Sequence, residues 1–536
     1  MVATAALQAR LTPESGSNSV LGLRANTDYS LRMKYDTIVV GAGSTGSVIS
    51  ERLSRISGHQ VLLIEAGPDH LPEQLPPDLA NGRQNATSHD WGFKHRPTVQ
   101  QFRFPLPRGR VVGGSSAVNT CIAIRALPRD IDEWGARGLA DWTFEQTLPA
   151  FCAIETDRDF DTPFHGQDGP LPLRRHPPEE LGTWQAALNE AARELGFSAC
   201  ADTNNPDTPE GFGSHAMNKR DGRRISAAEA WLTPAVRSRD SFHLQADTTV
   251  LHLDFSEDTV TGVTVQTPSG PQRILSDRVI LCAGSIQTPR LLLASGIGPR
   301  AELDRLNVPV RIDRPGVGAQ LLDHPGFAFF LRPKHSGLSD SHCGLIQTAL
   351  RTTLAGGPAH DIQVQVGSIV PVGTINLPLV SIMAMLGKPK ATGTIRWPSL
   401  DRKATPRIES RFLSHPDDLD RACAAIELGL ALLDTPAMRD LATTFFPMSR
   451  TLRSRARLKK RILGICDSGY HPCGTAPMGA DDDPMAVTDG RGRVRGTRNL
   501  FIGDASLMPT IPTGNIHLTT LMIGQRIGEW IAQDAG

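Results

Sequence analysis

The sequence has no apolar stretch that approaches the ~20 residues needed to span a lipid bilayer. The longest candidate, residues 377–386, is short and contains a proline, so we assign it to a folded core. Residues 1–33 also lack the apolar central run of a secretory signal peptide. We therefore expect no membrane span, and a cytoplasmic location fits these absences.

The sequence also lacks an excess of charge of either sign. Lysine and arginine number 56, as do aspartate and glutamate, so the formal net charge is zero. A balanced chain has no global field to attract polyanions, which argues against general nucleic-acid binding. The eight cysteines form no CxxC pair, which excludes a zinc ribbon and favours reduced thiols. The histidines show no ligand spacing, so we expect no metal site.

The composition is that of a large globular protein. The 536 residues are 39% hydrophobic, 21% charged and 5% aromatic, which argues against intrinsic disorder, collagen or a membrane bundle. This length predicts two or three domains, or one large α/β domain with a cap. Residues 1–33 show no clear periodicity, and we expect a poorly ordered extension with Met33 as the natural start. An organelle transit peptide is the alternative.

The first motif predicts a nucleotide site near the amino end. Residues 35–40 (YDTIVV) form a short β-branched run typical of a buried parallel strand. The glycine-rich turn GAGSTG (41–46) follows, then apolar residues at helical spacing and a second apolar run that ends before Glu65. This order is the strand–turn–helix–strand unit of dinucleotide-binding folds.

Each glycine of this turn has a physical reason. Gly41 permits the tight turn, Gly43 lets the backbone approach a pyrophosphate, and Gly46 lets helix and strand pack closely. The helix start supplies unpaired N–H groups for the phosphates. Glu65 can accept hydrogen bonds from ribose hydroxyls and would repel a 2′-phosphate. The motif therefore fits FAD or NAD, disfavours NADP, and alone does not separate the first two.

Several later segments resemble the glucose–methanol–choline (GMC) oxidoreductases. Residues 109–119 (GRVVGGSSAVN) are similar to the family's first signature and 282–290 (CAGSIQTPR) to its second. Residues 315–325 (PGVGAQLLDHP) match its GVGxxLxDH segment, and 471–479 match HxxGTxxMG. The resemblance runs from the first motif to the end of the chain, in the family's order and spacing.

The resemblance implies FAD as the cofactor and an α/β fold with two parts. The first is a Rossmann-like FAD-binding domain, expected at 34–157, 225–320 and 463–536. The second is an α+β substrate domain with a mostly antiparallel sheet, expected at 158–224 and 321–462.

The expected FAD-binding residues combine the first motif with positions implied by the family. Consecutive small residues in the GGSS segment can approach a flat ring or a phosphate. Some members of the family tether the flavin through a histidine two residues after the serine pair, but that position is Val118 here, so we expect non-covalent FAD. The expected set is Gly41, Gly43, Ser44, Thr45, Gly46, Glu65, Ala66, Arg110, Val112, Gly113, Gly114, Ser115, Asn119, Val250, Ala283, Gly284, Asp504, Ala505, Asn515 and Ile516.

The resemblance also assigns the catalytic histidine to His471 and its partner to Asn515. Oxidising an alcohol removes a hydride from carbon and a proton from oxygen, and imidazole is suited to taking that proton. An amide can hold the alkoxide oxygen but cannot take the proton, so we expect His471 to be the base. An isolated histidine is more often a core residue bonded to a backbone carbonyl; the surrounding motif favours the catalytic role.

The segments between the motifs are expected to form the substrate domain. Alternation at 361–366 predicts a half-exposed antiparallel strand, and 394–397 and 407–409 suggest further strands. Apolar spacing at 417–433 predicts a helix. The basic run at 449–461 (SRTLRSRARLKKR) is interpreted as a solvated helix face in preference to a patch for an acidic substrate or partner.

We expect an FAD-dependent enzyme that oxidises a small or medium alcohol, aromatic or allylic, to an aldehyde or ketone, with hydride passing to flavin N5. The layout is closest to bacterial choline-dehydrogenase-like and hydroxymethylfurfural-oxidase-like members. Oxygen or another acceptor then takes the electrons; the alcohol, the acceptor and the oligomeric state stay open. The alternatives are an FAD-containing hydroxynitrile lyase of the same fold and a nucleotide-binding protein without catalysis, which the pairing of His471 with Asn515 opposes.

Overall fold

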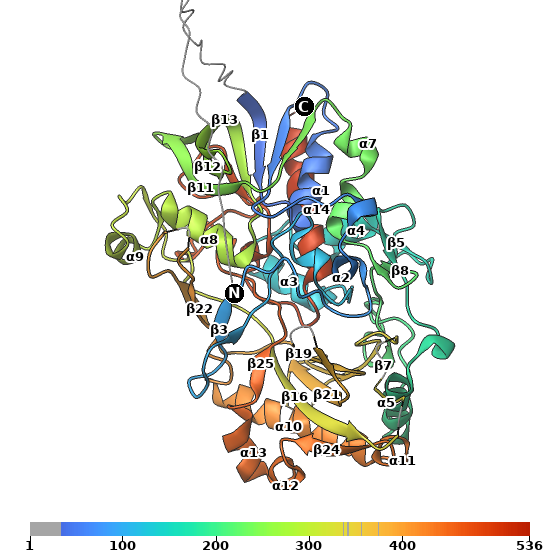
Figure 1. Ribbon diagram of the computed structural model, residues 1–536. Coiled ribbons are helices and arrows are strands. Elements are labelled where there is room, and N and C mark those ends of the chain that lie inside the picture. The colour runs from blue at the N-terminus through green and yellow to red at the C-terminus, as the bar shows by residue number, and fades with distance from the viewer. Residues whose placement is uncertain are drawn as a thin grey trace, which may run out of the picture. The chain divides into compact units, whose positions relative to one another are not determined.

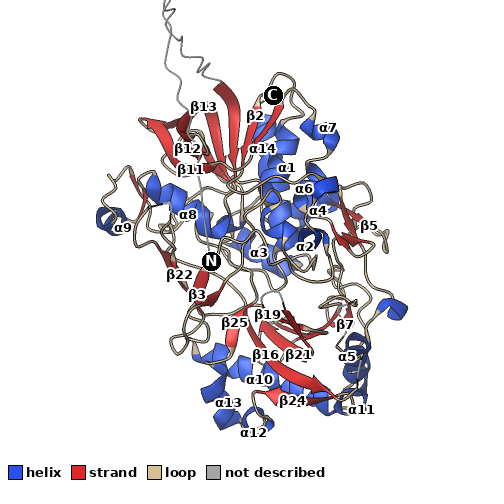
Figure 2. Ribbon diagram, in the orientation of Figure 1, coloured by secondary structure: helices blue, strands red, loops and turns tan. Residues whose placement is uncertain are grey.

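The computed structural model describes residues 34–535 except 336, 340, 341, 355, 373, 374 and 402 (Figures 1 and 2). The extension expected at 1–33 lies outside these residues. Two seven-stranded sheets organise the described chain. Among its helices, none is both long enough and apolar enough to cross a membrane.

The first sheet contains the nucleotide motif. Strand β1 (Lys34–Val40), helix α1 (Ser44–Leu53) and strand β2 (Val61–Ile64) confirm the unit predicted from the sequence. In spatial order the strands are β10 (Phe242–Gln245), β2, β1, β13 (Gly270–Leu281), β12 (Thr259–Thr267) and β11 (Thr249–Ser256), with β26 (Leu500–Ile502) also paired to β13.

This sheet is parallel where the cofactor motifs lie. β10, β2, β1, the second half of β13 and β26 run parallel, whereas β11, β12 and the first half of β13 form an antiparallel meander. Helix α1 packs against the last helix, α14 (His517–Ala535), on the side of the parallel strands away from the meander (Figure 1). The register places Val40 beside Leu281 and Leu281 beside Ile502, so the loops that follow these three strands converge at one edge.

The second sheet is antiparallel throughout, as expected for the substrate domain. Helices α5 (Thr183–Glu194) and α10 (Pro416–Asp434) pack on one face of it. Its strands are, in order, β24 (Ala442–Phe446), β16 (Pro325–Pro333), β21 (Val380–Leu386), β18 (Ile362–Gly367), β17 (Thr348–Thr352) and β7 (Gly211–Ser214), with β25 (Cys466–Ser468) paired to β16.

Alternation along these strands separates a helix-covered face from an open face. In β21, Val380, Ile382 and Leu386 are fully buried on the helix side, while Met383 and Met385 line a cavity on the other. The expectation of a half-exposed strand at 361–366 is wrong. Strand β18 is almost entirely buried because its polar face meets protein and the cavity.

The other strand and helix predictions for this part of the chain are confirmed. The segments at 394–397, 407–409 and 417–433 form β22, β23 and α10, and the basic run forms α12 and α13 (Figure 2). The remaining helices are α2 (Pro77–Ala80), α3 (Pro128–Ala136), α4 (Phe144–Ile154), α6 (Ala227–Trp231), α7 (Pro234–Arg237), α8 (Gly284–Ala294), α9 (Arg300–Arg305), α11 (Pro436–Arg439), α12 (Ser449–Leu452) and α13 (Arg455–Ile462). The smaller strands are β3 (Lys94–Arg96), β4 (Phe104–Pro105), β5 (Glu155–Asp157), β6 (Leu171–Leu173), β8 (Lys219–Arg220), β9 (Arg223–Arg224), β14 (Ile297–Gly298), β15 (Ile312–Asp313), β19 (Val370–Val372), β20 (Ile375–Leu377), β22 (Thr394–Arg396) and β23 (Arg407–Glu409).

The division into FAD-binding and substrate-binding segments stays a prediction. All strands of the first sheet fall in the segments expected to bind FAD. The second sheet follows the other segments with one exception, because β25 lies within 463–536 yet pairs with β16. The carboxyl-terminal segment therefore contributes to both sheets.

A buried group of charges fastens β5 to its surroundings. Both ring nitrogens of His165 face carboxylates, with Nδ1 3.0 Å from Asp157 and Nε2 2.9 Å from Asp202. Arg175 contacts the same two carboxylates at 2.9 and 2.5 Å. Atoms of Glu155, Asp157 and His165 lie within 4.8 Å of one another, as in a metal site, but the neighbouring guanidinium and imidazolium groups make this an ion-pair cluster.

The protonation of this cluster follows from its contacts. Burial alone would lower the pKa of His165, but hydrogen bonds to Asp157 and Asp202 raise it to about 11. Burial opposes ionisation of Asp157, whereas the hydrogen bond from His165 and the charge of Arg175 bring its pKa down to about 2. Cations and carboxylates thus hold each other charged in the folded state.

We predict that His165→Gln lowers the free energy of unfolding at pH 7 by ~3–5 kcal/mol, because two buried carboxylates lose a charged partner. The pKa of His165 is higher in the folded state than unfolded, so its contribution is complete below pH ~6.5 and disappears as pH rises toward about 11. Urea unfolding at pH 7, 9 and 10.5 should show the gap between wild type and variant narrowing. His252→Gln, at a histidine whose side chain is 45% exposed, is the control. A gap that stays constant with pH would contradict the assignment.

Candidate active site

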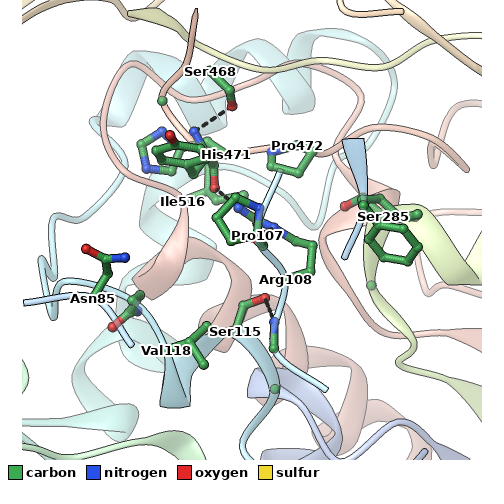
Figure 3. Close-up of a pocket in the computed structure, with 18 of the residues that line it drawn as sticks. Asn85, Pro107, Arg108, Ser115, Val118, Ser285, Ser468, His471, Pro472 and Ile516 are labelled. Atoms are coloured by element: carbon green, nitrogen blue, oxygen red, sulfur yellow. Dashed lines mark hydrogen bonds between the residues drawn. The ribbon is translucent and has the colours of Figure 1, made fainter. Parts of the chain in front are cut away.

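A cavity of about 1040 Å³ lies between the edge of the first sheet where the loops converge and the open face of the second (Figure 3). Typical ligand pockets measure ~300–1,000 Å³, so this cavity can hold a large cofactor together with a small substrate. One end is lined by the glycine turn that follows β1, and the other by the segments that follow β25 and precede α14.

The glycine turn leaves no room for side chains. Gly41 has φ +102°, and a Cβ there would lie 2.5 Å from the carbonyl oxygen of Cys282. A Cβ at Gly46 would lie 1.9 Å from the oxygen of Gly41, and one at Gly114 would lie 2.7 Å from Gly43 Cα. Helix α1 begins directly after Gly43 with no side-chain cap. Its first N–H groups are therefore available to an anion at the cavity wall.

Glu65 is placed to meet a ribose. Its carboxylate accepts hydrogen bonds from the N–H groups of Ala42 (3.0 Å) and Gly67 (2.9 Å) and lines the cavity. Burial raises the pKa of Glu65 to about 7, and these backbone donors act against that increase. A buried carboxylate with lone pairs left over favours hydroxyl donors from a bound ligand.

A second buried carboxylate joins the loops after β13 and β26. Asp504 accepts hydrogen bonds from the N–H of Gly284 (2.8 Å) and the hydroxyl of Thr288 (2.6 Å). Burial raises the pKa of Asp504, and these donors act against it. Helix α8 begins at Gly284, and Gly284 and Asp504 both line the cavity. The hydrogen bond from the N–H of Gly284 to Asp504 therefore positions a second helix start at the cavity wall.

These features fit FAD. The free N–H groups at the start of α1 suit a pyrophosphate, and Glu65 suits ribose hydroxyls. Gly43 and Gly114 line the cavity without side chains, so the backbone there can approach a bound cofactor closely. The cavity volume of about 1040 Å³ is also appropriate for a dinucleotide.

Strand pairing sets the position of His471. In the register of β16 with β25, Pro325 lies opposite Ser468, and the N–H of Gly469 donates to the carbonyl of His324 at 2.7 Å. His324 immediately precedes β16, and His471 follows β25 by three residues. Their Nδ1 atoms are consequently 2.9 Å apart.

One arrangement of protons satisfies this pair of rings. Nε2 of His324 lies 2.8 Å from the carbonyl oxygen of Pro512, so it must carry hydrogen and donate. A neutral His324 then has a bare Nδ1, which accepts from Nδ1–H of His471. The remaining nitrogen of His471, Nε2, is therefore unprotonated. That nitrogen is the one available to take a proton from a ligand.

Asn515 faces this nitrogen. Its amide Nδ2 lies 2.9 Å from Nε2 of His471 and donates to it, while its Oδ1 is buried and makes no hydrogen bond with protein. The loop that carries Asn515 is held by Asp130 of α3, which accepts from the N–H and hydroxyl of Thr513 at 2.9 and 2.7 Å. Nε2 of His471, which can accept, thus lies in the cavity beside Nδ2 of Asn515, which can donate, and Oδ1 of Asn515, which has no partner in the protein.

Asp323 fixes the backbone of both histidines. Its Oδ1 accepts from the N–H of His324 (2.8 Å) and of His471 (2.9 Å), and its Oδ2 accepts from the hydroxyl of Ser468. Burial raises the pKa of Asp323, and the donors from Ser468 and His471 act against it. A carboxyl group with this many donors locks the two rings in one relative orientation.

Electrostatics keep both rings neutral. Burial lowers the pKa of His471 well below that of ordinary histidine, and His324 and Arg108 lower it further. Burial also lowers the pKa of His324 to about 4. Arg108 lies close to His471, with its Nη2 donating to the carbonyl of Tyr470 at 2.8 Å (Figure 3). The hydrogen bonds that run from Asn515 through His471 and His324 to the carbonyl of Pro512 require both rings to be neutral.

Most residues that the sequence nominates meet at this cavity. His471 lines one end together with Asn515. The other nominated residues that line it are Gly41, Gly43, Ser44, Thr45, Glu65, Ala66, Gly114, Ser115, Asn119, Val250, Ala283, Gly284, Asp504, Ala505 and Ile516.

Four nominated residues do not line the cavity and instead shape the loops around it. Gly46 packs against the carbonyl of Gly41, and the N–H of Gly113 donates to Ala42 at 2.7 Å. The side chain of Arg110 is exposed and donates to the carbonyl of Ala66 at 3.1 Å. The four are Gly46, Arg110, Val112 and Gly113.

Two residues beside His471 carry no sequence signal that marks them as part of the site. His324 belongs to the LLDHP segment that supports the family resemblance, but only the register of β16 with β25 shows that it touches His471. Arg108 precedes the first signature, and its role depends on a loop contact with Tyr470. The cavity residues of β18 and β21, such as Gln365 and Met383, carry no motif at all.

The chain matches two protein-family models that together cover most of its length. The GMC oxidoreductase model for the amino-terminal part matches residues 35–326, and the model for the carboxyl-terminal part matches 389–524. A 5-(hydroxymethyl)furfural oxidase from Methylovorus sp. (strain MP688) is 32% identical over 94% of this chain and 99% of its own length. An oxygen-dependent choline dehydrogenase from Chromohalobacter salexigens is 31% identical over 92% of this chain and 94% of its own.

Solved structures agree with the fold. The crystal structure of pyridoxine 4-oxidase from Mesorbium loti superimposes with a TM-score of 0.86 at 28% identity, covering 93% of this chain and 99% of that one. A fungal aryl-alcohol oxidase shares the fold with a TM-score of 0.81 at 22% identity, over 94% of this chain and 100% of its own. GMC oxidoreductases are FAD flavoproteins. With the resemblance confirmed, the chain belongs to the GMC oxidoreductase family.

Proposed function

We propose that the protein oxidises a primary or secondary alcohol to an aldehyde or ketone with non-covalently bound FAD, and that His471 is the base. The observation that carries this proposal is the bare Nε2 of His471, directed at Asn515 in the cavity whose other end fits FAD. Bound FAD supplies a hydride acceptor at flavin N5. The chain's own residues must then handle the hydroxyl proton.

His471 and Asn515 divide the handling of the substrate oxygen. The alcohol hydroxyl donates to Nε2 of His471, replacing the amide in that contact, and transfers its proton there as the carbon loses hydride. The amide of Asn515 donates to the same oxygen and holds it while negative charge develops. Neither step requires movement of the backbone, because Asp323 and Asp130 already fix the two loops.

His324 keeps the base in its working tautomer. By accepting from Nδ1–H of His471, it leaves Nε2 as the only ring nitrogen able to receive a proton. When His471 becomes a cation, the same hydrogen bond remains intact, since His324 still accepts. The ring therefore does not have to turn between the two states.

The cavity wall beside His471 supports an apolar substrate. Met383, Met385 and Phe330 of the second sheet line it, as does Phe446. Such a surface accommodates a small or medium alcohol with an aromatic or allylic group better than a highly charged one. One relative of the chain is named 5-(hydroxymethyl)furfural oxidase, and the compound in that name has a hydroxymethyl group on an aromatic ring.

Non-covalent FAD binding is supported by Val118. This residue lines the cavity and has no atom able to form a bond with the flavin. Precipitation of the yellow protein with acid should therefore release all of the FAD into the supernatant. Yellow colour that stays with the pellet would contradict this part of the proposal.

The central test is flavin reduction without oxygen. Mixing the holoenzyme anaerobically with a panel of alcohols should bleach the flavin band near ~450 nm for at least one aromatic or allylic alcohol. Admission of air then shows whether oxygen restores it. A band unchanged by every alcohol, together with cleavage of a cyanohydrin, would replace the proposal with a lyase.

We predict that His471→Ala slows flavin reduction by at least ~10²-fold, because a positioned base contributes this much. Stopped-flow absorbance with saturating alcohol measures the rate constant, and FAD content per protein confirms that the cofactor site is intact. His252→Ala is the control. A variant that loses FAD but reduces normally after reconstitution would exclude His471 as the base.

A second variant pair isolates the positioning role of His324. We predict that His324→Ala slows flavin reduction by ~10–100-fold, as for other residues that orient a catalytic imidazole. His324→Asn places an amide oxygen where Nδ1 lies, so it should recover most of that loss by accepting from His471. Equal losses in both variants would mean that His324 acts only in packing.

A further inference from the structure

Exposed apolar side chains gather beside the active-site cavity on two separate segments. On the loop after β3, Val99 is 75% exposed and Phe102 is 90% exposed; beyond β24, Met448 is 55% exposed, and Phe445 at its end is 49% exposed. Side chains of this kind protruding singly are common, but clustered ones mark a binding surface.

The loop after β3 is held against the segment that leads from α13 into β25 (Figure 1). The hydroxyl of Thr98 donates to the carbonyl of Leu463 at 2.6 Å, and the amide of Gln101 donates to that of Cys466 at 3.0 Å. Arg461, two residues before Leu463, lies over the ring of Phe446 at 5.1 Å and so links the loop after β3 to the end of β24, although more than 300 residues separate these segments in the chain.

Arginines are interleaved with these side chains. Arg103 lies between Phe102 and Phe104 in the chain, while Arg332 and Arg461 lie over the rings of Phe445 and Phe446 at 5.3 and 5.1 Å. Arg450 follows Met448 by two residues. Within the described chain, no carboxylate lies within 4.0 Å of any of these four guanidinium groups. By contrast, Arg453 and Arg455 of the same basic run are paired with Asp434 and Glu427.

This surface borders the cavity. Phe104 and Phe446 both line the cavity and are 39% and 41% exposed, so the surface extends to the wall of the cavity. We call the surface the mouth patch and define it by its apolar and cationic members: Val99, Phe102, Phe104, Phe445, Phe446, Met448, Arg103, Arg332, Arg450 and Arg461.

We propose that the mouth patch docks on an anionic lipid bilayer and presents the cavity mouth to the membrane interface. Protruding phenylalanine, valine and methionine side chains insert among the upper acyl segments, and unpaired arginines beside them bind lipid phosphates at the headgroup level. A chain with zero net charge gains this attraction only where positive charge is locally unpaired, as it is here.

Two other occupants fit less well. A second copy of the chain meeting this surface face to face would bring two sets of four unpaired arginines together, which repel each other. Nucleic acid would use the arginines and aromatic rings, but protruding aliphatic groups such as Val99 and Met448 have no base or phosphate to contact. A lipid interface uses the charged and apolar members together.

Sedimentation of the holoenzyme with vesicles tests the proposal. We expect most of the protein to bind vesicles of equal parts phosphatidylglycerol and phosphatidylcholine, and at least ~10-fold weaker binding to phosphatidylcholine alone or in 0.5 M salt. Phe102→Ser with Met448→Ser, and separately Arg103→Gln with Arg450→Gln, should each weaken binding by ~10-fold. Flavin content and the melting temperature should stay unchanged, because all four side chains are on the surface.

The control pair is Met485→Ser with Arg498→Gln, one exposed apolar and one exposed basic residue outside the mouth patch. It should bind vesicles as wild type does. The proposal is overturned by absence of binding to anionic vesicles, by binding that the patch variants leave intact, by dimers that the patch variants dissociate in light scattering, or by tighter binding to a single-stranded oligonucleotide than to vesicles.

Discussion

The hydrogen bond between the Nδ1 atoms of His324 and His471 determines what the active site can do. The two atoms are 2.9 Å apart, and the direction of the hydrogen bond is imposed by the carbonyl of Pro512, which accepts from Nε2 of His324. Reversing it would leave Nε2 of His324 without a hydrogen to donate and would place a proton on the wrong nitrogen of His471. The carbonyl oxygen of Pro512 therefore decides which nitrogen of His471 is left unprotonated and facing Asn515.

The two sheets matter because they bring this bond to the cofactor cavity. β25 comes from the carboxyl-terminal segment, whose next strand, β26, belongs to the first sheet, yet it pairs with β16 of the second. Residues between β25 and β26 therefore cross from one sheet to the other, and His471 lies in this crossing. A shift in the β16–β25 register would separate His324 from His471. The pairing of these two strands is therefore also what fixes the tautomer of His471.

The parts of the fold and site that the sequence predicts are those with local geometric causes. Gly41 and Glu65 could be recognised because a tight turn and a ribose each demand one residue type at a set spacing. His324 could not be assigned a role, because its contact depends on pairing between strands 140 residues apart. The strand at 361–366 is predicted to be half-exposed but is almost entirely buried, since alternation reveals that a strand has two faces but not what covers each. For the same reason the sequence assigns residues 377–386 to a core without indicating that one face of β21 lines the cavity.

The low pKa of His471 looks unfavourable for a base, yet it fits the reaction. Burial and the nearby Arg108 keep the ring neutral over the physiological range, so its lone pair is always available. The same environment makes an isolated imidazolium costly. Proton transfer becomes favourable only when the substrate oxygen gains negative charge beside the ring, because the pair then attract in a site of low polarity. In the proposed reaction, departure of hydride from the carbon and arrival of the proton on Nε2 are thus coupled by electrostatics, and a hydroxyl that cannot lose hydride leaves His471 unprotonated.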